Sequence, residues 1–378
     1  MRTSMSSAGF RDLFPSTRNL VYFNHAAVGS LSVRACEAME AFARDQRDNG
    51  ALHWRDWYAE YDRARESAAR LIGATADEIA ILKNTSEGLS FVAQGLRWET
   101  GDNVVTSALE FPSNWSPWKR LDGVEVRVAG TRDGFTPEEV EKLIDDRTRL
   151  VTISSVAFHN GFASDLDAIG AICAKRNVLL CVDAIQSVGM LPTDVRRANI
   201  AFLAADGHKW MCGTEGAAIF YAAAEHRDKL DVLEIGWTNV VRKGSFIDCG
   251  TELVPTARRF EAGSLNSIGI HGLRAAIDLL LEIGMETVST NAIRVATQLA
   301  DALESIGFAV STRPVRSAIV GAIPPDVEKT SILYLHRRLE EAGIVCAPRE
   351  GMLRFSPHFY NDASDVDRVV DTLRRLTS

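Results

Sequence analysis

The chain has 378 residues, a formal net charge of −8 and 46% hydrophobic residues, an ordinary composition for a globular protein. A chain of this length can bury about three quarters of its unfolded surface and can form two domains. The negative charge argues against nucleic acid as the main partner, because contacts with phosphates favour a basic surface.

Neither the N-terminus nor the cysteines indicate export or membrane insertion. Residues 1–11 carry charges but no apolar signal core, and no apolar run is long enough to span a bilayer. The six cysteines are scattered without the paired spacing of a disulfide framework. We therefore expect a cytoplasmic protein with no membrane partner.

Strand and helix patterns alternate from the N-terminus to about residue 223. An extended segment at Tyr22–Ser30 is followed by helical periodicity at Val33–Arg47 and Trp54–Leu71. The next predicted elements are a strand at Asp77–Leu82, a helix opened by Lys83–Gly88, a strand at Asp102–Ser107, an aromatic loop at Glu110–Trp118, a strand at Arg149–Ser155 and a helix at Asp165–Lys175. This alternation predicts an α/β fold with a mostly parallel sheet and helices on both faces.

Two apolar runs, Val178–Val182 and Ile200–Ala205, indicate buried strands of that sheet. Ligands of such sheets lie outside the strand ends, so we expect four side chains at one edge: Asp183, Gln186, His208 and Lys209. By themselves, an acid and a lysine at this edge are consistent with a simple salt bridge. Taken alone they favour the salt bridge, but they also match the two contacts of pyridoxal 5′-phosphate (PLP), in which the lysine binds covalently and the acid keeps the pyridine nitrogen protonated.

The composition changes near residue 270. Thr251–Ser267 is irregular and polar, and a long helix is predicted at about 268–283. Strand and helix patterns resume at Ala309, Ser331–Ala342 and Gly351–Ser356, and an amphipathic helix begins at Ala363. We expect a large domain at residues 20–268 and a smaller C-terminal α/β domain of residues 1–19 and 269–378, with the long helix as the connector.

Motifs of one known family occur in order along the chain: Tyr22-Phe-Asn-His-Ala-Ala, Asn84-Thr-Ser-Glu-Gly, Asp183-Ala-Ile-Gln, Gly207-His-Lys, Phe260-Glu-Ala-Gly-Ser-Leu-Asn and Met352–Asn361. With them the chain resembles the class V aminotransferase family of fold-type I PLP-dependent transferases. It is most similar to the branch of cysteine desulfurases, selenocysteine lyases and isopenicillin-N epimerases. The resemblance extends from about Tyr22 to Asn361.

The resemblance implies PLP as the cofactor. Lys209 would bind it covalently, Asp183 would contact the ring nitrogen, and Gln186 would lie near the phenolic oxygen. The phosphate would be held by polar side chains, namely Thr85, Ser86, His208 and, from the partner subunit of a homodimer, Ser264. Without the resemblance, the polar turn before the helix at residue 85 would be interpreted as an ordinary N-cap.

The resemblance also implies substrate contacts. Arg354 would bind the α-carboxylate of an amino acid, a bidentate contact for which a planar guanidinium is suited. His25 lies in the first motif and is predicted at the substrate mouth. We expect no metal site, since no spacing of His, Cys, Asp or Glu suggests one.

Three positions differ from the cysteine desulfurase pattern. Phe111 stands where desulfurases carry a histidine that stacks on the cofactor ring, and a phenyl ring can stack but cannot transfer protons. Phe158 falls where many relatives have an asparagine near the phenolic oxygen. Cys346 lies in a short, strand-like segment rather than in the flexible loop that carries a persulfide, which indicates a structural cysteine.

These residues predict a PLP-dependent enzyme that acts at the α-carbon of a small amino acid. Transamination is placed first, because it requires only Lys209 as the proton shuttle. A C–S or C–Se lyase without a persulfide cysteine is second and an amino-acid epimerase third, since all three reactions share their first carbanion. A non-catalytic PLP-fold regulator is the alternative from a different class, and the intact set of Lys209, Asp183, Gln186 and Arg354 argues against it.

Overall fold

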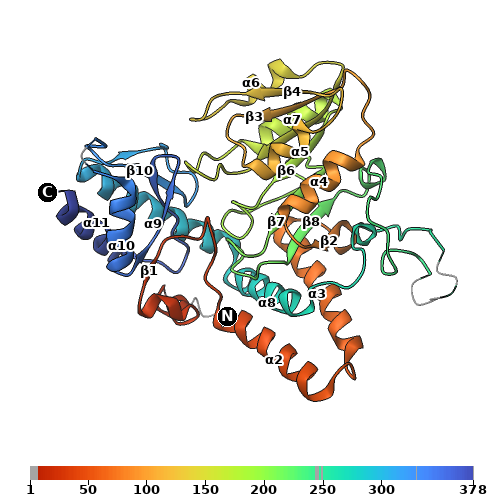
Figure 1. The fold of residues 1–378 in the computed structure, drawn as a ribbon, viewed down its shortest axis with the longest axis horizontal. Coiled ribbons are helices and arrows are strands. Elements are labelled where there is room, and N and C mark those ends of the chain that lie inside the picture. The colour runs from red at the N-terminus through yellow and green to blue at the C-terminus, as the bar shows by residue number, and fades with distance from the viewer. Residues whose placement is uncertain (1–6, 243–246, 248–249, 329, 378) are drawn as a thin grey trace.

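The computed structural model describes residues 7–242, 247, 250–328 and 330–377. A larger part is built around a seven-stranded sheet, and a smaller part carries the C-terminus (Figure 1). The strands of the larger sheet are β2 (Ile79–Leu82), β3 (Asn103–Ser107), β4 (Glu125–Ala129), β5 (Thr148–Ser154), β6 (Leu179–Asp183), β7 (Phe202–Asp206) and β8 (Ala218–Ala222).

The larger sheet has the order β2-β8-β7-β6-β5-β3-β4. Neighbouring strands are parallel from β7 to β4, whereas β8 is antiparallel to both β2 and β7. The predicted mostly parallel sheet is thus confirmed, but the sequence patterns do not predict β4 or β8. The edge strand β4 is half exposed and carries charged residues, so it lacks the continuous apolar run of the buried strands.

Helices cover both faces of this sheet because successive side chains of a strand point to opposite sides. On β7, Leu203 and Ala205 belong to a core shared with α3, α7 and α8, while Phe202 and Ala204 belong to the opposite core under α4. The helices of the chain are α1 (Ser7–Asp12), α2 (Val33–Asn49), α3 (Trp54–Ile72), α4 (Thr85–Gly95), α5 (Ser116–Lys119), α6 (Pro137–Leu143), α7 (Leu166–Arg176), α8 (Ser267–Ile283), α9 (Met285–Ser305), α10 (Ile332–Glu341) and α11 (Ala363–Thr377).

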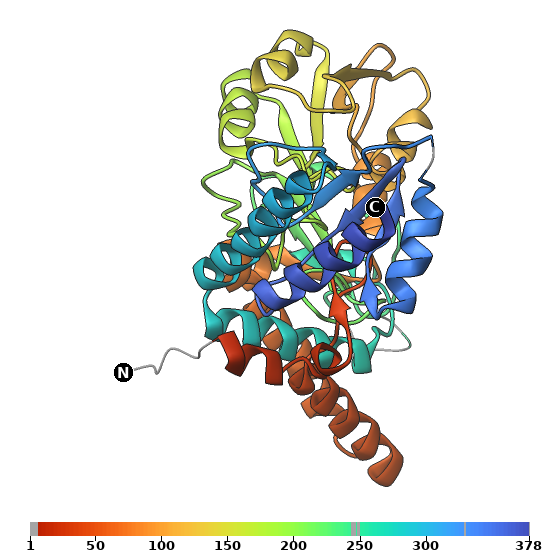
Figure 2. The same ribbon diagram turned by 90° about the vertical axis from the view of Figure 1, so that its left-hand side faces the viewer.

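The smaller part is an antiparallel sheet of order β12-β13-β10-β9, packed against α9, α10 and α11 (Figure 2). Its strands are β9 (Ala309–Val310), β10 (Val320–Ile323), β12 (Ala347–Arg349) and β13 (Met352–Phe355), and β1 (Val21–Tyr22) pairs in parallel with β11 (Ile344–Val345) beside it. Phe10 and Phe14 pack in the core of the larger sheet, while Val21 and Phe23 pack in that of the smaller one. The N-terminal segment therefore contacts both parts.

The observed elements agree with the predicted ones where the pattern is long and periodic. The helix predicted at 268–283 is α8, and the helix predicted at Trp54–Leu71 is α3. The predicted aromatic loop at 110–118 instead contains a 3₁₀ turn at Pro112–Asn114 and the short helix α5, each with a proline in its first turn. No helix in the described part of the chain is both long and apolar enough to cross a membrane.

Candidate active site

Asp183 and Lys209 come together at the carboxyl edge of the larger sheet. Asp183 is the last residue of β6 and is paired in register with Ala204 of β7. The turn that follows β7 carries His208 and Lys209, so both residues lie at the same edge of the sheet as Asp183. Burial lowers the pKa of Lys209, and the negative charge of Asp183 opposes that shift. Burial likewise raises the pKa of Asp183, which is 2% exposed, and the charge of Lys209 opposes it.

The loop after β1 packs against two of the predicted cofactor residues. A Cβ atom at Gly29 would lie 2.1 Å from the carbonyl oxygen of Lys209, so only glycine permits this approach of the two backbones. Gln186 donates from Nε2 to the carbonyl oxygen of Ala26 (3.0 Å) and accepts from the indole N–H of Trp210 (2.8 Å). These bonds orient the amide and use one of its two hydrogens.

The N-terminus of α4 provides an anion-binding geometry. Thr85 is 3% exposed, and its hydroxyl oxygen has no hydrogen-bond partner among the residues that the structure describes. An unpaired buried hydroxyl at a helix N-terminus suits a phosphate. Ser86 follows it and donates to the hydroxyl of Ser113 at 2.7 Å. The Nδ1 atom of His208 lies 2.9 Å from Oδ1 of Asp206, at an angle that makes no hydrogen bond.

Arg354 enters the site from β13 of the smaller part. It is 2% exposed, and its Nη1 donates to the carbonyl oxygen of Phe158 at 2.7 Å. Within the described chain its Nε and Nη2 atoms have no partner. Burial, and next the charge of Arg349, lower the pKa of Arg354 to about 9. A buried guanidinium with open donors is suited to a carboxylate, since an unpaired buried charge is costly.

Two phenyl rings lie beside the lysine. The ring centre of Phe111 is 5.8 Å from Nζ of Lys209, and the ring of Phe158 meets that of Phe111 edge-on at 5.1 Å. His159 and Asn160 turn away, because both bond to the carbonyl oxygen of Arg132. Of these three neighbours, Phe158 is therefore the one that faces Phe111.

His25 is fully buried and held on both sides of its ring. Its Nδ1 donates to the carbonyl oxygen of Ser356 at 2.9 Å, and its Nε2 accepts from the hydroxyl of Tyr360 at 2.6 Å. Burial lowers its pKa, so the ring is held neutral. Both ring nitrogens are bonded within the protein, so a substrate contact through His25 would have to replace one of these hydrogen bonds.

Ser264 lies at the surface, whereas Cys346 is buried. Ser264 is exposed and lines a cavity of about 110 Å³ together with Lys83 and Glu87, which flank the turn at the start of α4. Cys346 lies between β11 and β12, where it is 3% exposed, and burial raises the pKa of its thiol to about 12. A thiol in this state is a poor nucleophile.

Glu110 is a neighbour of the site to which the sequence motifs give no role. Its carboxylate accepts hydrogen bonds from the hydroxyl of Ser107 (2.6 Å), the amide of Asn114 (2.7 Å), and both the backbone N–H (2.9 Å) and hydroxyl (2.5 Å) of Ser154. Ser154 is paired in register with Asp183, and the charge of Glu110 raises the pKa of Asp183. The position of Glu110 directly before Phe111 is the one signal in the sequence that could have indicated that Glu110 lies near the site.

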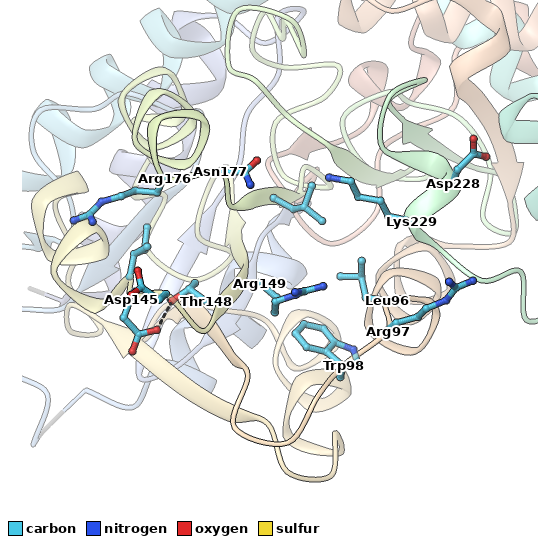
Figure 3. A pocket seen from close by; sticks show the side chains of 13 residues that line it. Leu96, Arg97, Trp98, Asp145, Thr148, Arg149, Arg176, Asn177, Asp228 and Lys229 are labelled. Atoms are coloured by element: carbon cyan, nitrogen blue, oxygen red, sulfur yellow. Dashed lines mark hydrogen bonds between the residues drawn. The ribbon is translucent and has the colours of Figure 1, made fainter.

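A separate pocket of about 640 Å³ lies at the other end of the strands (Figure 3). Thr148 and Leu179, at the starts of β5 and β6, line it, together with charged side chains that include Arg97, Asp145, Arg149, Arg176, Asp228 and Lys229. It is therefore not part of the lysine site. Across the described ranges, no group of three or more His, Cys, Asp or Glu side chains is arranged to hold a metal ion.

Comparisons with known proteins agree with this geometry. A profile of the family described as aminotransferase class-V matches residues 21–369. A probable cysteine desulfurase of Methanothermobacter thermautotrophicus is 30% identical, over 97% of this chain and 96% of its own length. An uncharacterized aminotransferase of Bacillus subtilis is 29% identical, over 97% of both chains. The apo structure of a cysteine desulfurase from Thermococcus onnurineus is 25% identical, with a TM-score of 0.91 over 100% of this chain and 99% of its own.

The fold and the site together define a PLP-dependent enzyme of fold type I. The chain belongs to the class V aminotransferase family. The residues present fit the cofactor, because the unpaired hydroxyl of Thr85 at the start of α4 offers a place for its phosphate. Lys209 and Asp183 would then hold its aldehyde carbon and its ring nitrogen.

Proposed function

We propose that the protein is an aminotransferase acting at the α-carbon of a small amino acid, with Lys209 as the group that moves the proton. The position of Phe111 carries the proposal, because its ring lies 5.8 Å from Nζ of Lys209 and contacts Phe158. Neither ring can donate or accept a proton, so the proton transfer falls to Lys209.

Arg354 would bind the α-carboxylate of the substrate through its open Nε and Nη2 atoms. A carboxylate held at two points orients the bonds at the α-carbon, and orientation supplies much of the rate of such reactions. The lowered pKa of Lys209 increases the neutral fraction of its amine, which is the form that accepts a proton. The amine can then return that proton to a neighbouring carbon.

PLP, when bound, supplies the electron sink for the charge that develops at the α-carbon. Asp183 would keep a negative charge at the ring nitrogen and so favour its protonated form. Gln186 would contact the phenolic oxygen, and Phe111 would stack on the ring. The phosphate would be held by Thr85, Ser86 and His208.

The proposal includes a homodimer with shared active sites. Ser264 is exposed on the isolated chain, so its hydroxyl is available to the phosphate of a partner subunit. We also propose that residues 20–268 act as the large cofactor-binding domain and residues 1–19 and 269–378 as the small domain. Arg354 reaches the site from the smaller sheet, and Phe10 and Phe14 connect the N-terminal segment to the core of the larger one. A cytoplasmic location fits the free thiols of the five cysteines that the structure describes.

A C–S or C–Se lyase is the second candidate, supported by the relatives named cysteine desulfurase. The burial of Cys346 argues against a persulfide on this residue. An epimerase would share the same proton transfer at Lys209 and is the third candidate. A non-catalytic regulator would have no use for the open donors of Arg354.

The test uses purified, PLP-loaded protein and a panel of amino acids. Absorbance is recorded while the products are identified by mass spectrometry. Formation of pyridoxamine phosphate with a 2-oxo acid is the expected result. Pyruvate with a released thiol would favour the lyase, inverted stereochemistry without net product would favour the epimerase, and no spectral response to any amine would contradict an enzymatic function.

A further inference from the structure

The hairpin that carries Arg354 carries a second arginine. β12 and β13 are antiparallel, with Ala347 paired to Arg354 and Arg349 paired to Met352. Residues two apart on a strand point to the same face, and so do directly paired residues. Arg349 and Arg354 therefore project from the same face as diagonal neighbours, and Ala347 and Met352 occupy the other two positions of that face.

A tight turn follows Arg349, which is exposed. Glu350 and Gly351 have φ angles of 47° and 80°, the left-handed pair of a tight two-residue hairpin turn. Glu350 pairs with Arg132 of the larger part at 2.8 Å. The carboxylate next to Arg349 in sequence is thus bound to another arginine.

Among the residues that the structure describes, the guanidinium of Arg349 has no anionic partner. Its hydrogen bond within the chain goes from Nη1 to the carbonyl oxygen of the preceding Pro348 at 3.0 Å. No carboxylate in the described ranges forms an ion pair with it. The charge of Arg349 lowers the pKa of both Arg354 and Lys209, which places it within electrostatic reach of the site. Two like charges on one face, with open donors, favour an anion with two charged ends.

We propose that the active site takes a dicarboxylate, with the α-carboxylate on Arg354 and the distal carboxylate on Arg349. The substrate class is a dicarboxylic amino acid as amino donor or the matching 2-oxo dicarboxylic acid as acceptor. In the complete exchange the donor loses its C–N bond and gains C=O, while the acceptor undergoes the reverse change, so no external oxidant is required. This inference rests on the proposed transamination and names its substrate.

The binding test uses the PLP-loaded protein and two unreactive acids, succinate and butyrate, measured by isothermal titration calorimetry. We expect succinate to bind at least about tenfold more tightly, because a charge-assisted contact is added at Arg349. Arg349→Gln should remove most of this preference and Arg349→Lys should keep part of it. The matched control Arg337→Gln alters an exposed arginine of α10 that pairs with Glu341 and should behave as the wild type.

The reaction test compares aspartate with asparagine and glutamate with glutamine, pairs that differ mainly in the distal charge. We expect kcat/KM to favour the acids by about tenfold or more, and this ratio to fall towards one in Arg349→Gln. Equal values for acid and amide in the wild type, or an unchanged ratio in the variant, would overturn the dicarboxylate proposal. If the dicarboxylate proposal fails but alanine is still converted to its 2-oxo acid, the proposed transamination remains supported. If no amino acid reacts, the proposed transamination is also contradicted.

Discussion

The Nζ atom of Lys209 lies over the ring of Phe111, 5.8 Å from its centre. Phe111 comes from the turn after β3, and Lys209 from the turn after β7, so the sheet order brings together residues that are far apart in sequence. A phenyl ring in this place offers a flat apolar surface without a titrating group. This relationship is the basis for favouring transamination over a reaction that needs a second acid.

Replacing Phe111 tests its proposed stacking on the cofactor. Phe111→Ala should weaken PLP binding about threefold to tenfold, which corresponds to the free energy of a typical aromatic stacking contact. Titration of the cofactor-free protein with PLP, followed by absorbance, measures this. Phe111→Tyr keeps an aromatic face and should bind PLP as tightly as the wild type. If Phe111→Ala also binds PLP with wild-type affinity, Phe111 does not stack on the cofactor.

The lysines of the cofactor-free protein should differ in their reactivity with pH. An amine reacts only when neutral, so a lower pKa shifts its modification to lower pH. Burial lowers the pKa of Lys209, whereas the hydrogen bond to Glu87 raises that of Lys83. In acetylation followed by peptide mass spectrometry, the midpoint for Lys209 should therefore lie below that for Lys83, and the reverse order would show that the site does not depress the pKa of Lys209.

Arg354→Lys tests the substrate contact. A lysine keeps one positive charge but loses the planar pair of donors, so KM for amino acids should rise about tenfold or more. An amine without a carboxylate provides the control, because its reaction should respond little to this change. Equal losses for both kinds of substrate would mean that Arg354 supports the fold rather than the carboxylate.

Gly29→Ala should disturb the Lys209 turn. The added Cβ would meet the carbonyl oxygen of Lys209 at 2.1 Å, and forced overpacking of this kind costs about 1–3 kcal/mol of unfolding free energy. Gly236→Ala is the matched control, since its nearest neighbour would be 3.3 Å away. Urea unfolding midpoints compare the two variants, and a wild-type midpoint for Gly29→Ala would count against a tightly held turn.

Cys346 should remain unmodified in the folded protein. The residue is 3% exposed, and burial raises the pKa of its thiol to about 12, so iodoacetamide at pH 8 should not label it within minutes. Incubation with cysteine should likewise leave no persulfide there by mass spectrometry. A persulfide on Cys346 would restore the desulfurase interpretation.

The local parts of this protein could be predicted from the sequence because they depend on short-range patterns. The apolar runs that end at Asp183 and shortly before His208 predicted two buried strands and the polar residues that follow them. The periodicity of α3 and α8 needed no tertiary information either. The order of the motifs was enough to indicate the family that the profile match confirms.

Other features depended on contacts between distant segments, which no local pattern encodes. The antiparallel β8, the burial of His25 against Ser356 and Tyr360, and the carboxylate of Glu110 beside Asp183 all follow from such contacts. The same holds for Arg349, which points with Arg354 only because the hairpin register places them on one face. The sequence determined which chemical groups are present, and the tertiary structure decided which of them are paired and which keep donors open for a ligand.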